Sequence, residues 1–131
     1  MQIAGGSAEK TRVLVIDDSR VMRHAVNRVL NQEFDILEAE DGEAGWEKLV
    51  SDQSVQVVIS DVQMPRLDGY SMICRIRAAD LSRIAGIPII VMTGADDDIT
   101  RERAFACGAN DFITKPIDSA QLCRRTCRRI P

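Results

Sequence analysis

The stretch VQVVISDVQMPRLDGY, residues 55–70, runs from an apolar segment into a carboxylate and then into two turn signals. Residues 55–60 favour a buried strand, because an almost continuous apolar run is typical of strands covered on both faces. Asp61 follows at once, and Met64-Pro65 and Asp68-Gly69 both favour turns. An acidic residue in this place either ends the strand or takes part in chemistry.

Composition excludes several classes of protein. The chain has 131 residues, of which 45% are hydrophobic and 28% charged, as expected for one globular domain with its own core. A net charge of -3 argues against a general nucleic-acid-binding domain. No apolar stretch approaches the roughly 20 residues of a membrane span, and the N-terminus has no signal-peptide pattern. We therefore expect a cytoplasmic protein.

The four cysteines do not form a recognisable metal site. Cys74, Cys107, Cys123 and Cys127 match no zinc-binding spacing, and the single histidine, His24, is distant in sequence. Disulfides are also not expected in a domain that can build its own core. We expect these cysteines to be buried or half-buried apolar side chains.

Strand and helix patterns alternate along the chain. Residues 1–10 predict a flexible N-terminal tail, and residues 11–131 predict the folded domain. Strands are predicted at 12–16, 35–39, 55–60, 87–92 and 111–114, and helices at 21–30, 43–50, 70–79, 100–107 and from about 118 to the end. Five such alternations predict an α/β domain with a parallel sheet.

Two of the predicted helices have a clear division of faces. In the first, the helical wheel groups Val21 with the apolar side chains and leaves His24 on the solvated face. In the last, the wheel places four arginines opposite the apolar arc, namely Arg124, Arg125, Arg128 and Arg129. We expect them to form a solvated face or a partner surface rather than a DNA site.

Polar residues stand at the carboxyl ends of four predicted strands. They are Asp17-Asp18 after the first strand, Asp61 after the third, Thr93-Gly94 after the fourth and Thr114-Lys115-Pro116 after the fifth. Ligands of open α/β sheets bind at this edge. Each residue alone has a structural explanation, such as a helix cap or a turn. Together they supply a carboxylate nucleophile, acidic ligands for Mg²⁺, a hydroxyl and an amine, which is a set suited to phosphoryl transfer.

The motifs VLVIDDS, VVISDVQMPRLDG, IIVMTG and GANDFITKP resemble those of the bacterial two-component response-regulator receiver domain (CheY-like). The resemblance covers nearly the whole chain from Arg12. It implies a doubly wound, flavodoxin-like sheet of five parallel strands in the order 2-1-3-4-5, flanked by five helices. It also implies a phosphoprotein of a phosphorelay that catalyses only its own phosphorylation and dephosphorylation.

The same resemblance implies a role for each site residue. Asp61 would receive the phosphoryl group from a sensor histidine kinase or phosphotransfer protein. Mg²⁺ would be held by Asp17, Asp18, Asp61 and the backbone carbonyl of Gln63. Thr93 and Lys115 would contact the phosphoryl oxygens, the Lys115-Pro116 bond would be cis, and Thr93 and Phe112 would form the switch.

Phosphorylation would then remodel the face made by the fourth helix, fifth strand and fifth helix. That face would act on a downstream effector domain or protein, or form a homodimer, and no membrane or direct nucleic-acid partner is expected.

Two positions near the acceptor, Gln63 and Ala95, vary within the family. The side chains at Gln63 and Ala95 usually tune the attack of water on the aspartyl phosphate. Ala95 offers no polar group to position that water, so we expect slower self-hydrolysis than in a relative with an acid or amide there. Phe112 lacks a hydroxyl, so its switching would depend on packing alone.

Three alternative functions stay open at this point. A haloacid-dehalogenase-like phosphatase uses similar groups but needs a second Asp where this chain has Gln63, and its nucleophile follows the first strand. A flavodoxin-like FMN protein needs a phosphate-binding loop where this chain has Asp17-Asp18. A receiver-like interaction module that is never phosphorylated would not need the complete set of site residues.

Overall fold

The structure is a computed structural model, and it describes residues 10–63, 68–94 and 98–130. The strands are β1 (Thr11–Ile16), β2 (Phe34–Ala39), β3 (Val55–Ser60), β4 (Ile89–Thr93) and β5 (Asp111–Thr114). The helices are α2 (Arg20–Leu30), α3 (Gly42–Ser51), α4 (Gly69–Arg77), α5 (Ser82–Ala85), α6 (Asp98–Cys107) and α7 (Ser119–Arg129). The predicted tail lies almost wholly outside the described residues.

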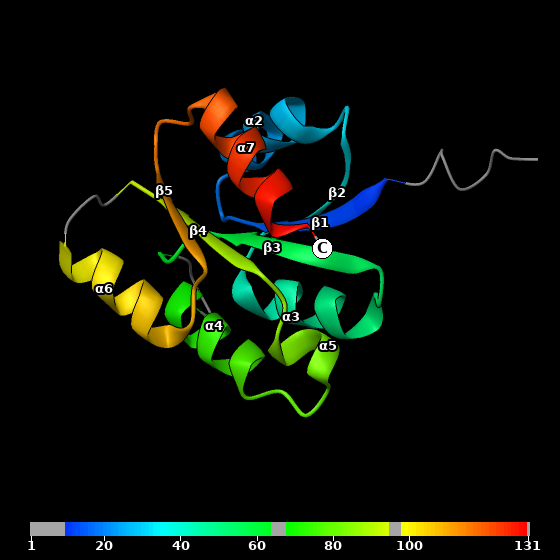
Figure 1. Cartoon of the computed structure of the whole chain (residues 1–131), viewed down its shortest axis with the longest axis vertical. Coiled ribbons are helices and arrows are strands. Elements are labelled where there is room, and N and C mark those ends of the chain that lie inside the picture. The colour runs from blue at the N-terminus through cyan, green and yellow to red at the C-terminus, as the bar shows by residue number, and fades with distance from the viewer. Residues whose placement is uncertain (1–9, 64–67, 95–97, 131) are drawn as a thin grey trace, which may run out of the picture.

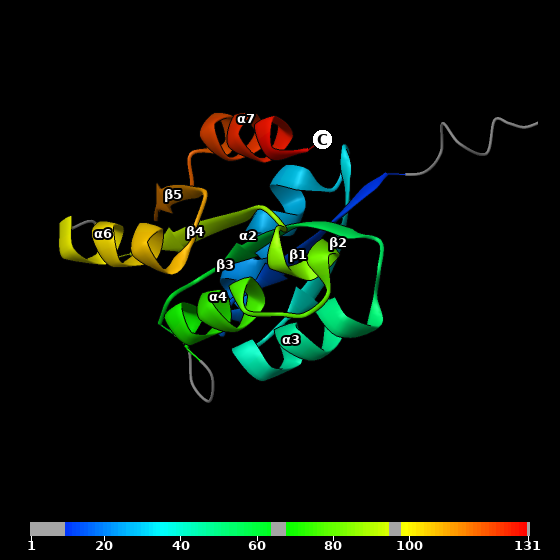
Figure 2. The same ribbon diagram turned by 60° about the horizontal axis from the view of Figure 1, so that its bottom comes forward.

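The five strands form one parallel sheet in the order β2-β1-β3-β4-β5, which confirms the predicted fold. Helices α2 and α7 cover one face, and α3, α4, α5 and α6 lie on the other side (Figure 1). Figure 2 shows the same division after a turn of the molecule. The four-residue α5 is additional to the five helices that the sequence predicted.

The core has two parts because the sheet is covered on both faces. Alternate residues of the central strands enter different clusters: Leu14 and Val58 pack beneath α3 and α4, whereas Val13 and Val57 pack beneath α2 and α7. All four side chains are fully buried. This is why β1 and β3 have continuous apolar sequences rather than alternating ones.

Side chains cap the N-termini of helices α2, α3, α4 and α7. Ser19 accepts a hydrogen bond from the Met22 backbone N–H at the start of α2, and Asp118 accepts one from Gln121 at the start of α7. Gly108 has a φ of 119° just after α6, a conformation that favours glycine. None of the described helices is long and apolar enough to cross a lipid bilayer.

The prediction that Val21 belongs to the apolar half of its helix was wrong. Its side chain is 80% exposed, whereas Val26 and Leu30 of the same helix are buried. Val21 lies in the first turn of α2. His24 is exposed, as predicted.

The prediction for the arginines of the last helix was also wrong for two of the four, because Arg125 and Arg129 are half-buried. Arg125, Arg128 and Arg129 form ion pairs with Asp111, the buried first residue of β5. Burial raises the pKa of Asp111, but Arg125, the Phe112 backbone N–H and Arg128 outweigh this and hold the pKa below its ordinary value. These arginines therefore attach α7 to β5, while Arg124 and Arg128 are exposed, as predicted.

All four cysteines are free, so no disulfide forms, as predicted. Cys107 and Cys123 are half-buried, but Cys74 and Cys127 are exposed, contrary to the prediction. The apolar arcs of α4 and α7 are filled instead by larger side chains, such as Ile73 and Leu122.

Candidate functional site

The site is built where the strands β1 and β3 end side by side. The Asp61 backbone N–H donates to the Ile16 carbonyl at 3.0 Å, which places Asp61 next to Asp17. The Asp17 N–H donates in turn to the Ala39 carbonyl of β2 at 3.1 Å. Asp17 and Asp61 are 0% and 6% exposed, so two carboxylates are buried side by side at this edge of the sheet.

Backbone donors fix the orientation of both carboxylates. Asp61 Oδ1 accepts from the N–H groups of Val62 and Gln63 at 2.7 and 3.2 Å. Asp17 Oδ1 accepts from the Ser19 N–H at 2.9 Å. Because one oxygen of each carboxylate is held by backbone donors, the other oxygen is oriented toward its neighbours in the site.

The Lys115 ammonium lies between the other two carboxylate oxygens, Asp17 Oδ2 and Asp61 Oδ2. Its Nζ lies 3.0 Å from Asp17 Oδ2 and 3.0 Å from Asp61 Oδ2. Lys115 follows β5, and its backbone N–H donates to the Thr93 carbonyl at 2.8 Å, so β4 and β5 position the ammonium. The Lys115–Pro116 peptide bond is cis.

The pKa values reflect this burial and pairing. Burial raises the pKa of Asp17, and the Ser19 N–H and Lys115 only partly offset it. Burial lowers the pKa of Lys115, but hydrogen bonds with Asp61 and Asp17 outweigh this, so its pKa lies above the ordinary value. Lys115 is therefore a cation at neutral pH.

Three carboxylates are close enough to share a cation. Ligand oxygens of Asp17, Asp18 and Asp61 lie within 4.8 Å of one another, and Asp18 is exposed. The single positive charge of Lys115 does not balance the negative charges of three carboxylates. A set of ligands made only of oxygen atoms suits a hard divalent ion that keeps several of its water molecules. The residues present therefore fit Mg²⁺. Gln63 is exposed beside them, and its backbone N–H binds Asp61 Oδ1.

The two predicted switch residues lie on the neighbouring strands β4 and β5. Thr93 ends β4, is 1% exposed and pairs in register with Thr114. Phe112 is 4% exposed, so its ring is buried in this structure. It lies beside Phe105 of α6, with ring centroids 6.5 Å apart, and the Arg101 guanidinium lies 4.8 Å from its centroid. Ala95 and Met64-Pro65 lie outside the described residues.

Two residues that support the site were not predicted from sequence. Gly69 begins α4 directly against Asp61: a Cβ there would lie 2.2 Å from the Asp61 backbone oxygen. The Asp68-Gly69 step was recognised only as a turn. Arg23 donates to the Asp17 carbonyl at 2.7 Å and pairs with Glu38, and no pattern in the sequence signals these two contacts.

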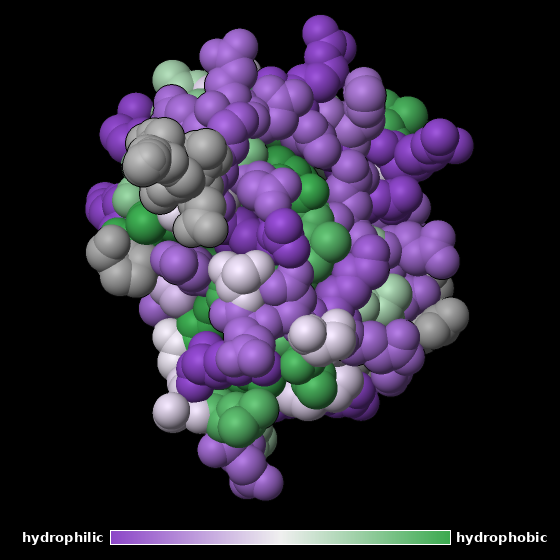
Figure 3. All heavy atoms as spheres, turned by 90° about the vertical axis from the view of Figure 1, so that its right-hand side faces the viewer, coloured by the Kyte–Doolittle hydropathy of each residue, from purple (hydrophilic) through white to green (hydrophobic). Residues whose placement is uncertain are grey.

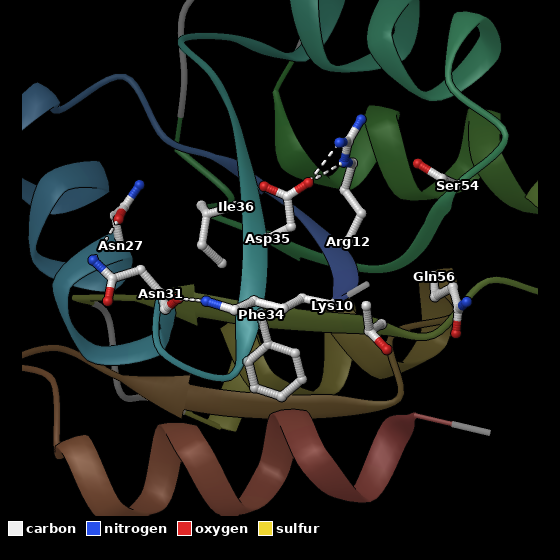
Figure 4. A pocket seen from close by; sticks show the side chains of 10 residues that line it. Lys10, Arg12, Asn27, Asn31, Phe34, Asp35, Ile36, Ser54 and Gln56 are labelled. Atoms are coloured by element: carbon white, nitrogen blue, oxygen red, sulfur yellow. Dashed lines mark hydrogen bonds and ion pairs between the residues drawn. The ribbon is translucent and has the colours of Figure 1, made fainter. Parts of the chain in front are cut away.

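A second hollow, at the opposite edge of the sheet, contains none of these groups. Lys10, Arg12, Asn31, Phe34 and Asp35 are among the residues that line it (Figure 4). Its cations are already paired, because Arg12 binds Asp35 and Asp52 and Lys10 donates to the Asn31 carbonyl. From this side the surface is mainly hydrophilic with small apolar patches (Figure 3).

Comparisons with known proteins agree with this geometry. Residues 13–126 match the response regulator receiver domain family. Chemotaxis protein CheY1 of Helicobacter pylori is 36% identical over 107 residues, which cover 80% of this chain and 85% of that protein. Among solved structures, Vibrio cholerae CheY4 matches with a TM-score of 0.84 and 26% identity over 93% of this chain and all of that one. A putative response regulator of Chloroflexus aurantiacus matches with a TM-score of 0.85 and 25% identity, over 92% and 98% of the two chains. The chain is therefore a CheY-like receiver domain of the two-component response-regulator family.

Proposed function

We propose that Asp61 accepts a phosphoryl group from the phosphohistidine of a sensor histidine kinase or phosphotransfer protein. The observation that carries the proposal is the position of Lys115, whose ammonium lies 3.0 Å from carboxylate oxygens of both Asp17 and Asp61. Beyond this self-directed chemistry the domain needs no enzymatic activity of its own.

The transfer uses the oriented carboxylate as a nucleophile. As Asp61 forms a new O–P bond, the N–P bond of the donor breaks and its electron pair stays with the imidazole nitrogen. Backbone donors hold Asp61 Oδ1, so Oδ2, which faces Lys115, is the oxygen that meets the phosphorus. Lys115 stabilises the negative charge on the transferred group, and the Thr93 hydroxyl supplies a further donor.

Asp17, Asp18, Asp61 and the Gln63 carbonyl are the groups that would hold Mg²⁺, which would neutralise the charge gathered by the carboxylates and the phosphoryl oxygens. Asp17 and Asp61 are held in place by backbone donors before any ion binds. This preorganisation means that little rearrangement opposes binding.

Phosphorylation would act on the face formed by α6, β5 and α7, through Thr93 and Phe112. Helix α6 has only one buried residue, Ala104, over its ten residues, so its contact with the core is small. The buried Phe112 ring contacts Arg101 and Phe105 of α6. A change at Thr93 would thus alter a surface offered to an effector domain or protein, or to a second copy of the chain.

The experiment is incubation with acetyl phosphate and Mg²⁺ followed by intact-mass analysis. We expect one added phosphoryl group that is stable to acid and labile to base, and none on an Asp61→Asn variant. An adduct that persists on this variant would contradict the assignment. Steady hydrolysis of a phosphoester would instead favour the phosphatase, and absence of any adduct would favour an interaction module.

A further inference from the structure

Two helices on the same face of the sheet, α4 and α6, each carry a cysteine where they pack together. The helices lie side by side in both ribbon views (Figure 1, Figure 2). Cys74 belongs to α4 and is exposed, whereas Cys107 is the last residue of α6 and is half-buried. Both thiols are free. The candidate site described above makes no use of either of them.

Contacts on either side of the two cysteines place them opposite each other. One helical turn before them, the Arg103 guanidinium of α6 lies 4.0 Å from the ring centroid of Tyr70 of α4. Just beyond them, the Arg77 guanidinium of α4 donates to the Gly108 carbonyl at 3.0 and 2.8 Å. Each cysteine follows the first contact by four residues along its own helix. The two helices therefore run in the same direction, with both cysteines between the same two contacts.

The two sulfur atoms also interact directly. Burial raises the pKa of the Cys107 thiol, and a hydrogen bond with the Cys74 side chain raises it further. Such a bond requires the sulfur atoms to lie next to each other, as they must before a disulfide can form. A Cβ on Gly108 would lie 2.8 Å from Arg77 Cγ, so the end of α6 is packed closely on α4 beside the cysteines. This close approach limits how far the helices must move to bring the sulfur atoms into bonding distance.

The other two cysteines lack this arrangement. Cys123 and Cys127 are four residues apart on α7, so their Cβ atoms are about 5–6 Å apart, beyond the roughly 3.5–4.5 Å that a disulfide requires. Cys127 Sγ instead lies 3.5 Å from a carboxylate oxygen of Glu33, and Cys123 Sγ lies 3.8 Å from the Val29 carbonyl. These two thiols provide an internal control for the first pair.

A metal ion explains the thiol pair less well. Among the residues that the structure describes, only Asp17, Asp18 and Asp61 form a group of three or more possible metal ligands. Structural zinc sites use four protein ligands and catalytic zinc sites use three. Two thiols without a further ligand therefore fit an oxidation reaction better than a metal site.

We propose that Cys74 and Cys107 form a reversible disulfide when the domain meets hydrogen peroxide. Cys74 reacts first because it is the exposed member of the pair. Its thiolate attacks one oxygen of the peroxide, the O–O bond breaks, and a sulfenic acid forms as hydroxide leaves. The Cys107 sulfur then attacks the Cys74 sulfur, the S–O bond breaks, and the oxygen leaves as water with the Cys107 proton. The two thiols lose two electrons, and the peroxide gains them.

The disulfide would connect the helix beside the acceptor to the helix of the output face. Helix α4 begins at Gly69, which lies against the Asp61 backbone, and α6 contacts Phe112 through Arg101 and Phe105. A covalent link at the end of α6 would restrain this helix, whose contact with the core is small. The disulfide itself does not depend on phosphorylation, and only its effect on the output face rests on the proposed function.

The test treats the reduced protein with a small excess of hydrogen peroxide and then alkylates the remaining thiols. We expect four alkylated cysteines before oxidation and two after it, and four again after dithiothreitol. Cleavage before aspartate separates the thiols, since Cys74 falls in residues 68–79, Cys107 in 98–110 and the other two in 118–131. Mass spectrometry without reduction should find 68–79 joined to 98–110. The same link is expected in Cys123→Ser/Cys127→Ser and not in Cys74→Ser.

Hydrogen exchange measures the effect of the link on α6. We expect amide exchange in α6 to slow about tenfold in the oxidised protein and to recover on reduction, because a covalent link opposes local opening. Cys74→Ser treated in the same way is the control and should show no slowing.

The proposal is overturned if peroxide does not join 68–79 to 98–110, if 118–131 is joined to either peptide as readily, or if the link connects two copies of the chain. Unchanged exchange of α6 in the oxidised protein would contradict the restraint. Asp61→Asn should form the same disulfide, and reduced Cys74→Ser should still be labelled by acetyl phosphate. These two controls separate a failure of the disulfide from a failure of the proposed phosphorylation.

Discussion

Gly69 lies against the backbone of Asp61 so closely that a Cβ on it would be 2.2 Å from the Asp61 carbonyl oxygen and 2.4 Å from the Val62 Cα. The Gly69 N–H also donates to the Val62 carbonyl at 3.0 Å. The first turn of α4 is thus held directly on the residues that orient the Asp61 carboxylate. This contact connects the packing of the domain to the geometry of its site.

Gly69→Ala is expected to displace α4 or the Asp61 backbone, because backbone atoms cannot yield as a flexible side chain can. Overpacking of this kind costs about 1–3 kcal/mol. Urea denaturation and the rate of labelling by acetyl phosphate measure the two effects. Gly94→Ala is the matched control, since a Cβ there meets nothing within 4 Å. Equal behaviour of the two variants would show that the close approach is unimportant.

Lys115→Met is expected to slow phosphorylation of Asp61, because the transferred group loses its positive partner. It should also leave the carboxylates of Asp17 and Asp61 without the ammonium that now bridges them. We expect the free energy of unfolding to fall by about 1–3 kcal/mol without Mg²⁺. Denaturation without Mg²⁺ and labelling with it test both effects, and a variant labelled at the wild-type rate would remove Lys115 from the mechanism.

Asp18→Asn is expected to weaken Mg²⁺ binding with little effect on the fold, since Asp18 is the exposed member of the carboxylate cluster. Calorimetric titration with Mg²⁺ should show the loss, and the rise in melting temperature on adding Mg²⁺ should shrink with it. Asp80→Asn removes an exposed carboxylate from another part of the surface and is the control. Unchanged Mg²⁺ affinity in Asp18→Asn would contradict the predicted site.

Asp111→Asn is expected to destabilise the domain, because three arginines lose their buried carboxylate. Removing one partner of a buried ionic cluster costs about 3–5 kcal/mol, and solvent screening of the half-exposed arginines reduces this. The pKa of Asp111 lies below its ordinary value, so its contribution to stability is present at neutral pH and is lost as the pH falls below about 4. Denaturation at pH 7 should show a lower free energy of unfolding for Asp111→Asn than for the wild type, and this difference should vanish in acid. A difference that stays the same at both pH values would contradict the assignment.

The sheet and the site could be predicted from sequence because they depend on local patterns. Continuous apolar runs identified β1, β3 and β4, and the residues directly after the strands identified Asp17, Asp61 and Lys115. Parallel strands bring their carboxyl ends to one edge whatever the details of packing. The position of the carboxylate cluster follows from this rule.

The features that were missed depend on contacts between distant segments. A helical wheel gives the relative directions of side chains but not which half meets the sheet in the first turn, so Val21 was placed wrongly. The pairing of Arg125, Arg128 and Arg129 with Asp111 requires the packing of α7 on β5 to be known. The approach of Gly69 to Asp61 is likewise a tertiary contact.

The identity of the phosphorylated residue is the most direct test of the central claim. The protein is treated with acetyl phosphate and Mg²⁺ and then with borohydride, which reduces an acyl phosphate of aspartate to homoserine, and peptide mass spectrometry locates the product. The account predicts homoserine at position 61 and unmodified Asp17 and Asp18. Homoserine at either of those two positions, or at none, would contradict it.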